Sequence, residues 1–160
     1  IGKPFKEILK SLNIEKKKFS LIEKHYKSKS YQNLKKVKFY PHVLNTLKYL
    51  KRKKYFLGVL TSKDKFRTDI VLKRLKLKFD IIQCPHKNYY GKPYPDLMNK
   101  IIKVKKLNKK DCIYIGDTIY DLMMCKAAKI DFLFAKYGYK IGIKNYKYKI
   151  DKFVDIKKIL

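Results

Sequence analysis

Two aspartates, Asp117 and Asp121, carry the clearest chemical signal in the sequence. They follow a short apolar run at residues 112–115, which is typical of a buried parallel strand, and Gly116 ends that run. Because open α/β sheets bind ligands at the carboxyl ends of their strands, Asp117 is expected to lie in such a crevice. Two carboxylates spaced by four residues at a helix start suit a divalent cation such as Mg²⁺. They also suit a helix N-terminus alone, whose dipole favours acidic side chains, so this stretch leaves both interpretations open.

A hydroxyl pair and a lysine stand at two other predicted strand ends. Thr61 and Ser62 close the apolar run at residues 55–60, and hydroxyls with backbone N–H groups at a helix start can bind an anion. A simple N-cap is the structural alternative for this pair. Lys92 lies in a Gly-Lys-Pro tripeptide that also occurs at residues 2–4, so only its place before a predicted helix gives it weight. If these strand ends meet, a hydroxyl, a lysine and two carboxylates would surround a phosphate and its Mg²⁺.

Apolar runs alternate with helical patterns from residue 43 onward. The predicted strands lie at residues 55–60, 79–82, 112–115 and 132–135, and the predicted helices carry residues 43–50, 70–75, 97–104, 118–128 and 152–160. Strands that alternate with helices form βαβ units. The sequence therefore predicts an α/β fold, with a Rossmann-like parallel sheet and helices on both of its faces.

Residues 1–36 show only helical periodicity. Phe5, Ile8 and Leu9 recur at helical spacing, and lysines fill the other faces. No strand pattern precedes residue 55, so this segment is predicted to be a helical module of its own.

The composition limits the class of protein. At 160 residues the chain has room for one domain with a core, and 46% hydrophobic residues argue against a disordered chain. The net charge of +29 invites a nucleic-acid function, but lysine supplies all but three of the 42 basic residues and is spread along the whole chain. Because nucleic-acid readers rely on arginine, no specific nucleic-acid partner is expected. No apolar run approaches the roughly 20 residues of a membrane span, so no membrane partner is expected.

The three cysteines, Cys84, Cys112 and Cys125, are odd in number and have no Cys-x-x-Cys spacing. Two of them lie in apolar contexts, where a cysteine behaves as a small buried hydrophobe. They are therefore interpreted as reduced thiols, which indicates a cytoplasmic protein.

The order and spacing of the polar motifs resemble the haloacid dehalogenase-like (HAD) phosphohydrolases, and more narrowly the phosphoglycolate phosphatase and β-phosphoglucomutase branch. Residues 39–51 resemble the segment that leads into the second family motif, and residues 135–139 resemble the loop after the last core strand. Between them, residues 60–63 resemble the second motif, residues 91–96 the third and residues 115–121 the fourth. The resemblance implies that residues 1–37 form part of a helical cap and residues 38–160 the HAD-like core.

The resemblance also implies an activity, a Mg²⁺-dependent phosphate monoester hydrolase that works through an aspartyl-phosphate intermediate. Thr61, Lys92 and Asp117 would be its catalytic residues in this chain. Thr61 and Ser62 would bind phosphoryl oxygens, and Lys92 would offset the charge of the phosphoryl group and the nucleophile. Asp117 would bind Mg²⁺ directly, and Asp121 would bind it through water or orient Lys92. The expected partner is a small phosphorylated metabolite.

The first motif of the family, an Asp-x-Asp that supplies the nucleophile, does not occur in the sequence. In the family its strand lies at the centre of the sheet, between the strands that here end at Thr61 and Asp117. Without it both neighbours would expose an edge. The fold is therefore expected to lack the central strand and the chain as given to be inactive, and an N-terminally incomplete sequence is the simpler explanation. Two alternatives stay open: a catalytically dead domain that binds a phosphorylated ligand or a protein partner, and a basic nucleic-acid-binding protein.

Two smaller departures from the family pattern concern single residues. Ser62 stands where the family often has Asn, and it keeps a side chain that forms hydrogen bonds. Lys129 stands where the family usually has Gly. If the backbone there is left-handed, a lysine costs roughly 1 kcal/mol of stability.

Overall fold

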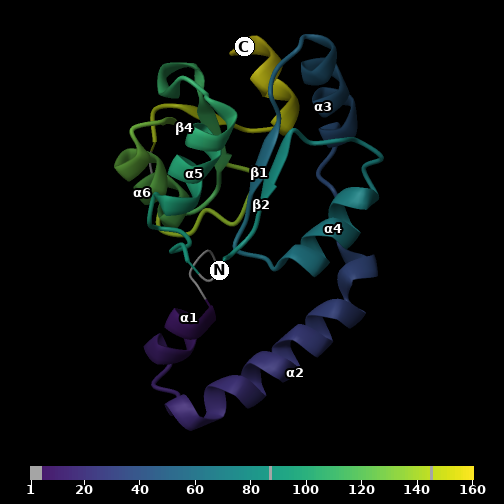
Figure 1. Ribbon diagram of the computed structural model, residues 1–160. Helices are drawn as coiled ribbons and strands as arrows, with labels where there is room; N and C mark the ends of the chain where they lie inside the picture. Colours follow the sequence, from purple (N-terminus) through teal and green to yellow (C-terminus); the bar gives the residue numbers. More distant parts are fainter. Residues whose placement is uncertain (1–4, 87, 145) are drawn as a thin grey trace.

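The computed structural model describes residues 5–86, 88–144 and 146–160 (Figure 1). The α-helices are α1 (Phe5–Ser11), α2 (Phe19–Gln32), α3 (Val43–Arg52), α4 (Lys65–Lys73), α5 (Asp96–Lys105) and α6 (Ile119–Ala128). Short 3-10 helices occur at η1 (Lys16–Lys18), η2 (Leu34–Lys36), η3 (Lys109–Asp111) and η4 (Phe153–Lys158). The strands are β1 (Gly58–Leu60), β2 (Ile81–Gln83), β3 (Ile113–Gly116), β4 (Asp131–Ala135) and β5 (Lys149–Ile150).

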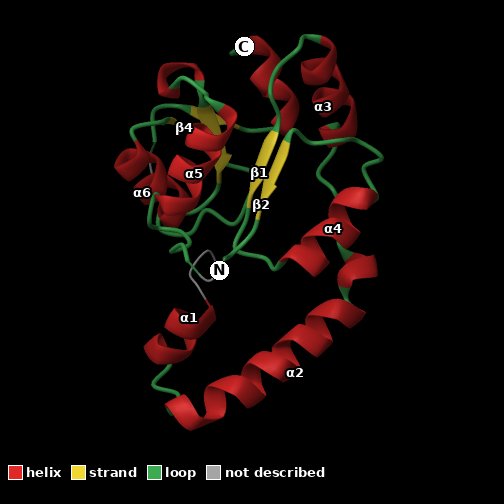
Figure 2. Cartoon of the chain, in the orientation of Figure 1, coloured by secondary structure: helices red, strands yellow, loops and turns green. Residues whose placement is uncertain are grey.

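The strands form two parallel sheets (Figure 2). β1 pairs with β2, with Gly58 opposite Ile81, while β3, β4 and β5 make a second sheet in which Ile113 lies opposite Asp131. Within the described residues no strand lies between β1 and β3. This division confirms the expected α/β fold without its central strand, because the break falls between the two strands that the missing one would join.

β4 is the most buried strand because helices cover both of its faces. Phe132 and Phe134 point into a cluster with residues of α5 and α6, whereas Leu133, between them, packs with Leu50 of α3 and Ile156 of η4. The alternation follows from the two-residue period of a strand. Figure 1 shows the resulting layers, with α5 and α6 on one side of β4 and α3 with the C-terminal helix on the other.

The N-terminal helices contact the core through two arginines, Arg67 within α4 and Arg74 directly after it. Arg67, which is 6% exposed, donates hydrogen bonds to Asp64 at 2.6 Å and to Ser30 of α2 at 2.8 Å. Arg74 donates to the carbonyl of Leu34 at 3.2 Å. These bonds hold α2 and η2 against α4. The boundary between a cap at residues 1–37 and a core at 38–160 stays a prediction.

Lysines occupy many of the left-handed backbone positions. The non-glycine residues with positive φ are Asn13, His42, Lys54, Lys76, Lys106, Lys129 and Lys140. Lys129 has φ 57° and ψ 53° after the last residue of α6, so the left-handed backbone considered for this position is present. Glycine and asparagine adopt this conformation at lower cost, so the lysine-rich composition lowers the stability of several turns.

The sequence predicted four strands within a few residues of their observed bounds but missed β5. This strand has only two residues, Lys149 and Ile150, and it forms by pairing with β4. A two-residue strand has no periodicity of its own, so only the tertiary contact reveals it. In the part of the chain that the structure describes, no helix combines the length and apolarity that a membrane span requires.

Candidate active site

The candidate site lies where β1 and β3 end. Thr61 directly follows β1, and Asp117 directly follows β3, whose last residue is Gly116. β3 and its parallel neighbour β4 point the same way, and α6 begins two residues after Asp117. Asp117 therefore lies at a strand carboxyl end beside a helix N-terminus, as the sequence predicted.

Asp121 accepts more hydrogen bonds than Asp117, the other carboxylate of the site. It is 2% exposed, and its Oδ1 accepts hydrogen bonds from Lys92 Nζ at 2.6 Å and from the Tyr114 hydroxyl at 3.2 Å. Its Oδ2 accepts from the Thr118 hydroxyl at 2.7 Å, from Thr118 N at 3.1 Å and from Asp117 N at 3.3 Å. Asp121 thus closes a capping box with Thr118 and anchors Lys92, so it does more than a solvated aspartate in a first helical turn.

The charge state of Asp121 follows from two opposed effects. Burial alone would raise its pKa, but the nearby Lys92 ammonium and the hydrogen bonds from Lys92 and Thr118 hold the pKa below its ordinary value. Lys92 is only 11% exposed in its side chain, so the two charges face each other largely shielded from water. A fixed ion pair therefore stands at the edge of the site.

Tyr114 links the two sheets, and sequence reasoning did not single it out. Its hydroxyl lies 3.2 Å from the carbonyl oxygen of Leu60 in β1 and 3.2 Å from Asp121 Oδ1, so one phenolic hydrogen is shared between two acceptors. Burial and the Asp121 charge raise the pKa of this tyrosine well above its ordinary value, so it stays a hydrogen donor. In the sequence it is one apolar residue of a buried strand, with nothing to mark the contact.

The structure corrects the expectation for Thr61 and Ser62. Helix α4 begins at Lys65 and is capped by Asp64, whose carboxylate accepts from Arg67 N at 2.8 Å. The hydroxyl pair therefore lies in the loop before the helix, and an acidic side chain already occupies the helix start that was expected to bind an anion. Thr61 Oγ1 accepts from Lys63 N at 3.1 Å, which makes a local turn and leaves the hydroxyl hydrogen free to donate.

A loop after β4 holds Asp117 in place. Tyr139 N donates to Asp117 Oδ2 at 2.7 Å, and a Cβ added at Gly138 would come within 2.4 Å of the Asp117 side chain. The loop continues to Ile141, whose carbonyl accepts from Ile119 N at 2.8 Å. Gly138 is therefore required at this close approach, and only its position after a predicted strand hinted at the role.

The residues present fit Mg²⁺ in part. Among the described residues, no group of three or more His, Cys, Asp or Glu side chains could hold a metal ion. Asp117 Oδ1 accepts no hydrogen bond within that same part of the chain, so it can serve as one ligand. Mg²⁺ usually takes one or two carboxylates and completes its shell with water and phosphate oxygens. Both oxygens of Asp121 are engaged, so the geometry suits the role of orienting Lys92 better than direct metal binding.

The chain belongs to the haloacid dehalogenase-like hydrolase family, whose sequence profile matches residues 1–135. It is 30% identical to phosphoglycolate phosphatase 1 of Pseudomonas aeruginosa over 105 residues, which cover 64% of this chain and 39% of the relative. It is 26% identical to the pyrophosphatase PpaX of Bacillus mycoides over 89 residues, which cover 54% of this chain and 41% of that protein. The chain thus spans about two-fifths of the length of these curated relatives.

Solved structures of the same family share the fold. A candidate phosphoglycolate phosphatase of Lactobacillus plantarum superposes with a TM-score of 0.89 and 16% identity, over 99% of this chain and 78% of its own. A haloacid dehalogenase-like family hydrolase of Streptococcus pneumoniae superposes with a TM-score of 0.83 and 20% identity, over 99% of this chain and 77% of its own. At these identities the likeness establishes the fold alone.

Proposed function

We propose that this chain is part of a Mg²⁺-dependent phosphate monoester hydrolase that works through an aspartyl-phosphate intermediate. The observation that carries the proposal is the buried Lys92–Asp121 ion pair, 2.6 Å long, beside Asp117. Desolvating two charges is costly, so a buried pair of this kind suggests a role beyond stability. The Lys92 ammonium, held in this position, would attract a phosphate that enters the site. Membership of the family and the phosphatase names of its relatives support the same reaction class.

Thr61, Lys92 and Asp117 have contacts that allow their proposed roles. Thr61 would donate its hydroxyl hydrogen to a phosphoryl oxygen, aided by the backbone N–H of Ser62. Lys92 donates one ammonium hydrogen to Asp121, so the remaining ammonium hydrogens can face the phosphoryl group and the nucleophile. Asp117 would hold Mg²⁺ through Oδ1, and the bound ion would neutralise charge on the phosphoryl oxygens.

The nucleophile would come from an aspartate on a strand that lies between β1 and β3. Such a strand would pair with both exposed edges and end between Thr61 and Asp117. The carboxylate oxygen would attack phosphorus, the ester P–O bond would break, and the leaving alcohol would take a proton from a second acid. Water would then release inorganic phosphate and restore the carboxylate. Because the sequence holds no Asp-x-Asp, we propose that this chain alone does not turn over substrate.

The proposed substrate is a small phosphorylated metabolite, and the proposed compartment is the cytoplasm. The three cysteines are free in the structure, which supports a reducing compartment. A specific nucleic-acid function gains no support from the arginines, because two of the three, Arg67 and Arg74, donate hydrogen bonds to other parts of the chain.

The test is a phosphatase assay on the protein extended by its own upstream coding sequence. We expect Mg²⁺-dependent release of inorganic phosphate from simple phosphate esters, lost in the Asp117→Ala variant and retained in Lys136→Ala, which changes an exposed lysine outside the site. Full activity in Asp117→Ala would overturn the assignment of the metal ligand. Phosphate-ester binding without turnover in the extended protein would favour the catalytically dead domain instead.

A further inference from the structure

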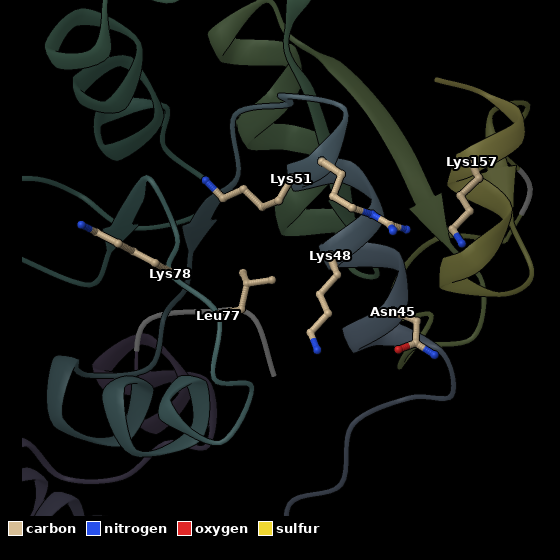
Figure 3. Close-up of a pocket in the computed structure, with 7 residues that line it drawn as sticks. Asn45, Lys48, Lys51, Leu77, Lys78 and Lys157 are labelled. Carbon is tan, nitrogen blue, oxygen red and sulfur yellow. The ribbon is translucent and has the colours of Figure 1, made fainter.

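A second concave surface lies at the far end of the strands from the candidate active site. It is an open hollow of about 610 Å³, lined by Asn45, Lys48, Lys51, Arg52, Leu77, Lys78 and Lys157 (Figure 3). We call it the basic pocket. α3 precedes β1 in the chain, and Leu77 and Lys78 precede β2, so the pocket lies toward the amino ends of these strands. Thr61, by contrast, follows the carboxyl end of β1.

The basic pocket is more positive than the composition of the chain explains. Five of its seven lining residues are Lys or Arg, compared with 42 of 160 in the whole chain. A second hollow, formed by α2, provides an internal comparison at 510 Å³. It is lined by Ser20, Glu23, Lys24, Lys27, Ser28 and Tyr31, and Lys27 pairs with Glu23 at 2.8 Å. The second hollow thus contains an acidic residue beside its lysines, whereas every charged residue that lines the basic pocket is basic.

The positive charge of the basic pocket is mostly uncompensated. Lys51 pairs with Asp80 at 2.6 Å, and Asp80 also accepts from Leu57 N at 2.7 Å. Within the described part of the chain, the side chains of Lys48, Arg52 and Lys78 form no hydrogen bond or ion pair. Like charges held in one concavity repel each other, and a bound anion would relieve that repulsion.

Arg52 adds a specific recognition group. The other two arginines hold the N-terminal helices to α4, whereas Arg52 lies on the pocket wall. A guanidinium presents a planar fork of donors that matches two phosphate oxygens at once. Asn45 on the same helix adds an amide donor.

We propose that the basic pocket binds a small polyanion with three or more adjacent phosphate groups, of the class of inorganic oligophosphates and nucleoside triphosphates. Its volume falls in the range of about 300–1,000 Å³ that suits a small ligand. The cations come from three separate elements, as Figure 3 shows for Lys48, Lys78 and Lys157. Because these cations are spread over three elements, a chain of phosphates can contact more of them than a single phosphate can. This site does not depend on the proposed hydrolase activity.

The test is isothermal titration calorimetry of this chain with tripolyphosphate, in metal-free buffer at low salt. We expect binding that weakens about tenfold in Arg52→Gln/Lys78→Gln, because two charge contacts are lost. The matched control Lys24→Gln/Lys35→Gln removes two exposed lysines elsewhere and should leave the affinity nearly unchanged. Both double variants keep the Lys51–Asp80 pair, so circular dichroism should show the wild-type fold. Lys48→Gln provides a second test if the double variant unfolds.

Titration with ATP distinguishes the two proposed classes of ligand, inorganic oligophosphates and nucleoside triphosphates. Tighter binding of ATP than of tripolyphosphate would indicate a nucleoside triphosphate, and equal binding would indicate that the phosphates alone are recognised. Equal weakening in both double variants, binding of monophosphate as tight as that of tripolyphosphate, or no binding would each overturn the proposal. Tighter binding of a single-stranded oligonucleotide, lost equally in both double variants, would overturn it in favour of general charge attraction.

Discussion

The Lys92–Asp121 ion pair allows the most demanding test of the site. The substitution Lys92→Met removes the ammonium group and keeps an unbranched apolar stem, so it changes charge more than packing. Asp121 would lose its charged partner but keep hydrogen bonds from Tyr114, Thr118 and Asp117. Because Asp121 is 2% exposed, water cannot replace the lost ammonium.

The stability that Lys92→Met should lose can be estimated from the burial of Asp121. Removing one partner of a buried ion pair costs about 3–5 kcal/mol, because the remaining charge is left uncompensated. The hydrogen bonds that Asp121 retains place the expected loss near the lower end, at about 3 kcal/mol of unfolding free energy at pH 7. A small domain has only about 5–15 kcal/mol in total, so Lys92→Met should lose roughly a fifth to three fifths of its stability.

The loss of stability in Lys92→Met should become larger as the pH rises from 4 to 7. In the wild type the folded-state pKa of Asp121 is lowered, so the pair contributes stability above the unfolded pKa of about 4 and loses it as the pH falls below that value. In Lys92→Met burial dominates and the folded-state pKa rises, so acid relieves the uncompensated charge. The difference between the two proteins should therefore be largest at neutral pH and shrink toward pH 4.

Urea unfolding followed by circular dichroism at pH 7 and pH 4.5 measures this difference. The control is Lys136→Met, which breaks the exposed Lys136–Asp151 pair at 2.8 Å and should change stability very little. If Lys92→Met is no less stable than the control at pH 7, the buried pair does not exist in solution. A deficit that stays constant between the two pH values would also refute the reasoning, since it would not arise from the Asp121 charge.

Three further predictions follow from single contacts. Gly138→Ala should lower kcat of the extended protein by about 10²-fold, because the new Cβ displaces the Asp117 carboxylate, and an unchanged kcat would contradict the role of the loop. Lys129→Gly should raise the unfolding free energy by about 1 kcal/mol in urea denaturation by relieving a left-handed backbone, and a loss of stability would contradict it. Burial raises the pKa of both the half-buried Cys112 thiol and the fully buried Cys125 thiol, the latter to about 12. Iodoacetamide at pH 8 should therefore label Cys112 much faster than Cys125, and mass spectrometry of the folded protein should detect the difference.

Hydrophobic periodicity and the order of the motifs were sufficient to predict the core of the fold. The apolar runs at β1 to β4 and the helices between them follow from local patterns, and the break between β1 and β3 follows from the absent Asp-x-Asp strand. The left-handed Lys129 was also predictable, because a helix C-terminus commonly ends in that conformation.

The contacts that organise the site were not predictable, because they join residues far apart in sequence. Tyr114 reaches the carbonyl of Leu60 and Asp121 across the gap between the sheets, and its sequence context shows only a buried strand. The Asp64 cap is different, because Asp64 and its partner Arg67 are only three residues apart. It is a local feature that the sequence interpretation missed, whereas the Tyr114 contacts depend on the tertiary structure.

The most direct test of the central claim is to read the coding sequence upstream of Ile1. We predict an apolar strand that ends in Asp-x-Asp, able to pair with the exposed edges of β1 and β3 and to place its first aspartate beside Lys92 and Asp117. A start codon directly upstream, with no such strand, would contradict this prediction and exclude hydrolysis by this mechanism. The chain would then be a HAD-like domain that retains the phosphate-facing groups without the nucleophile.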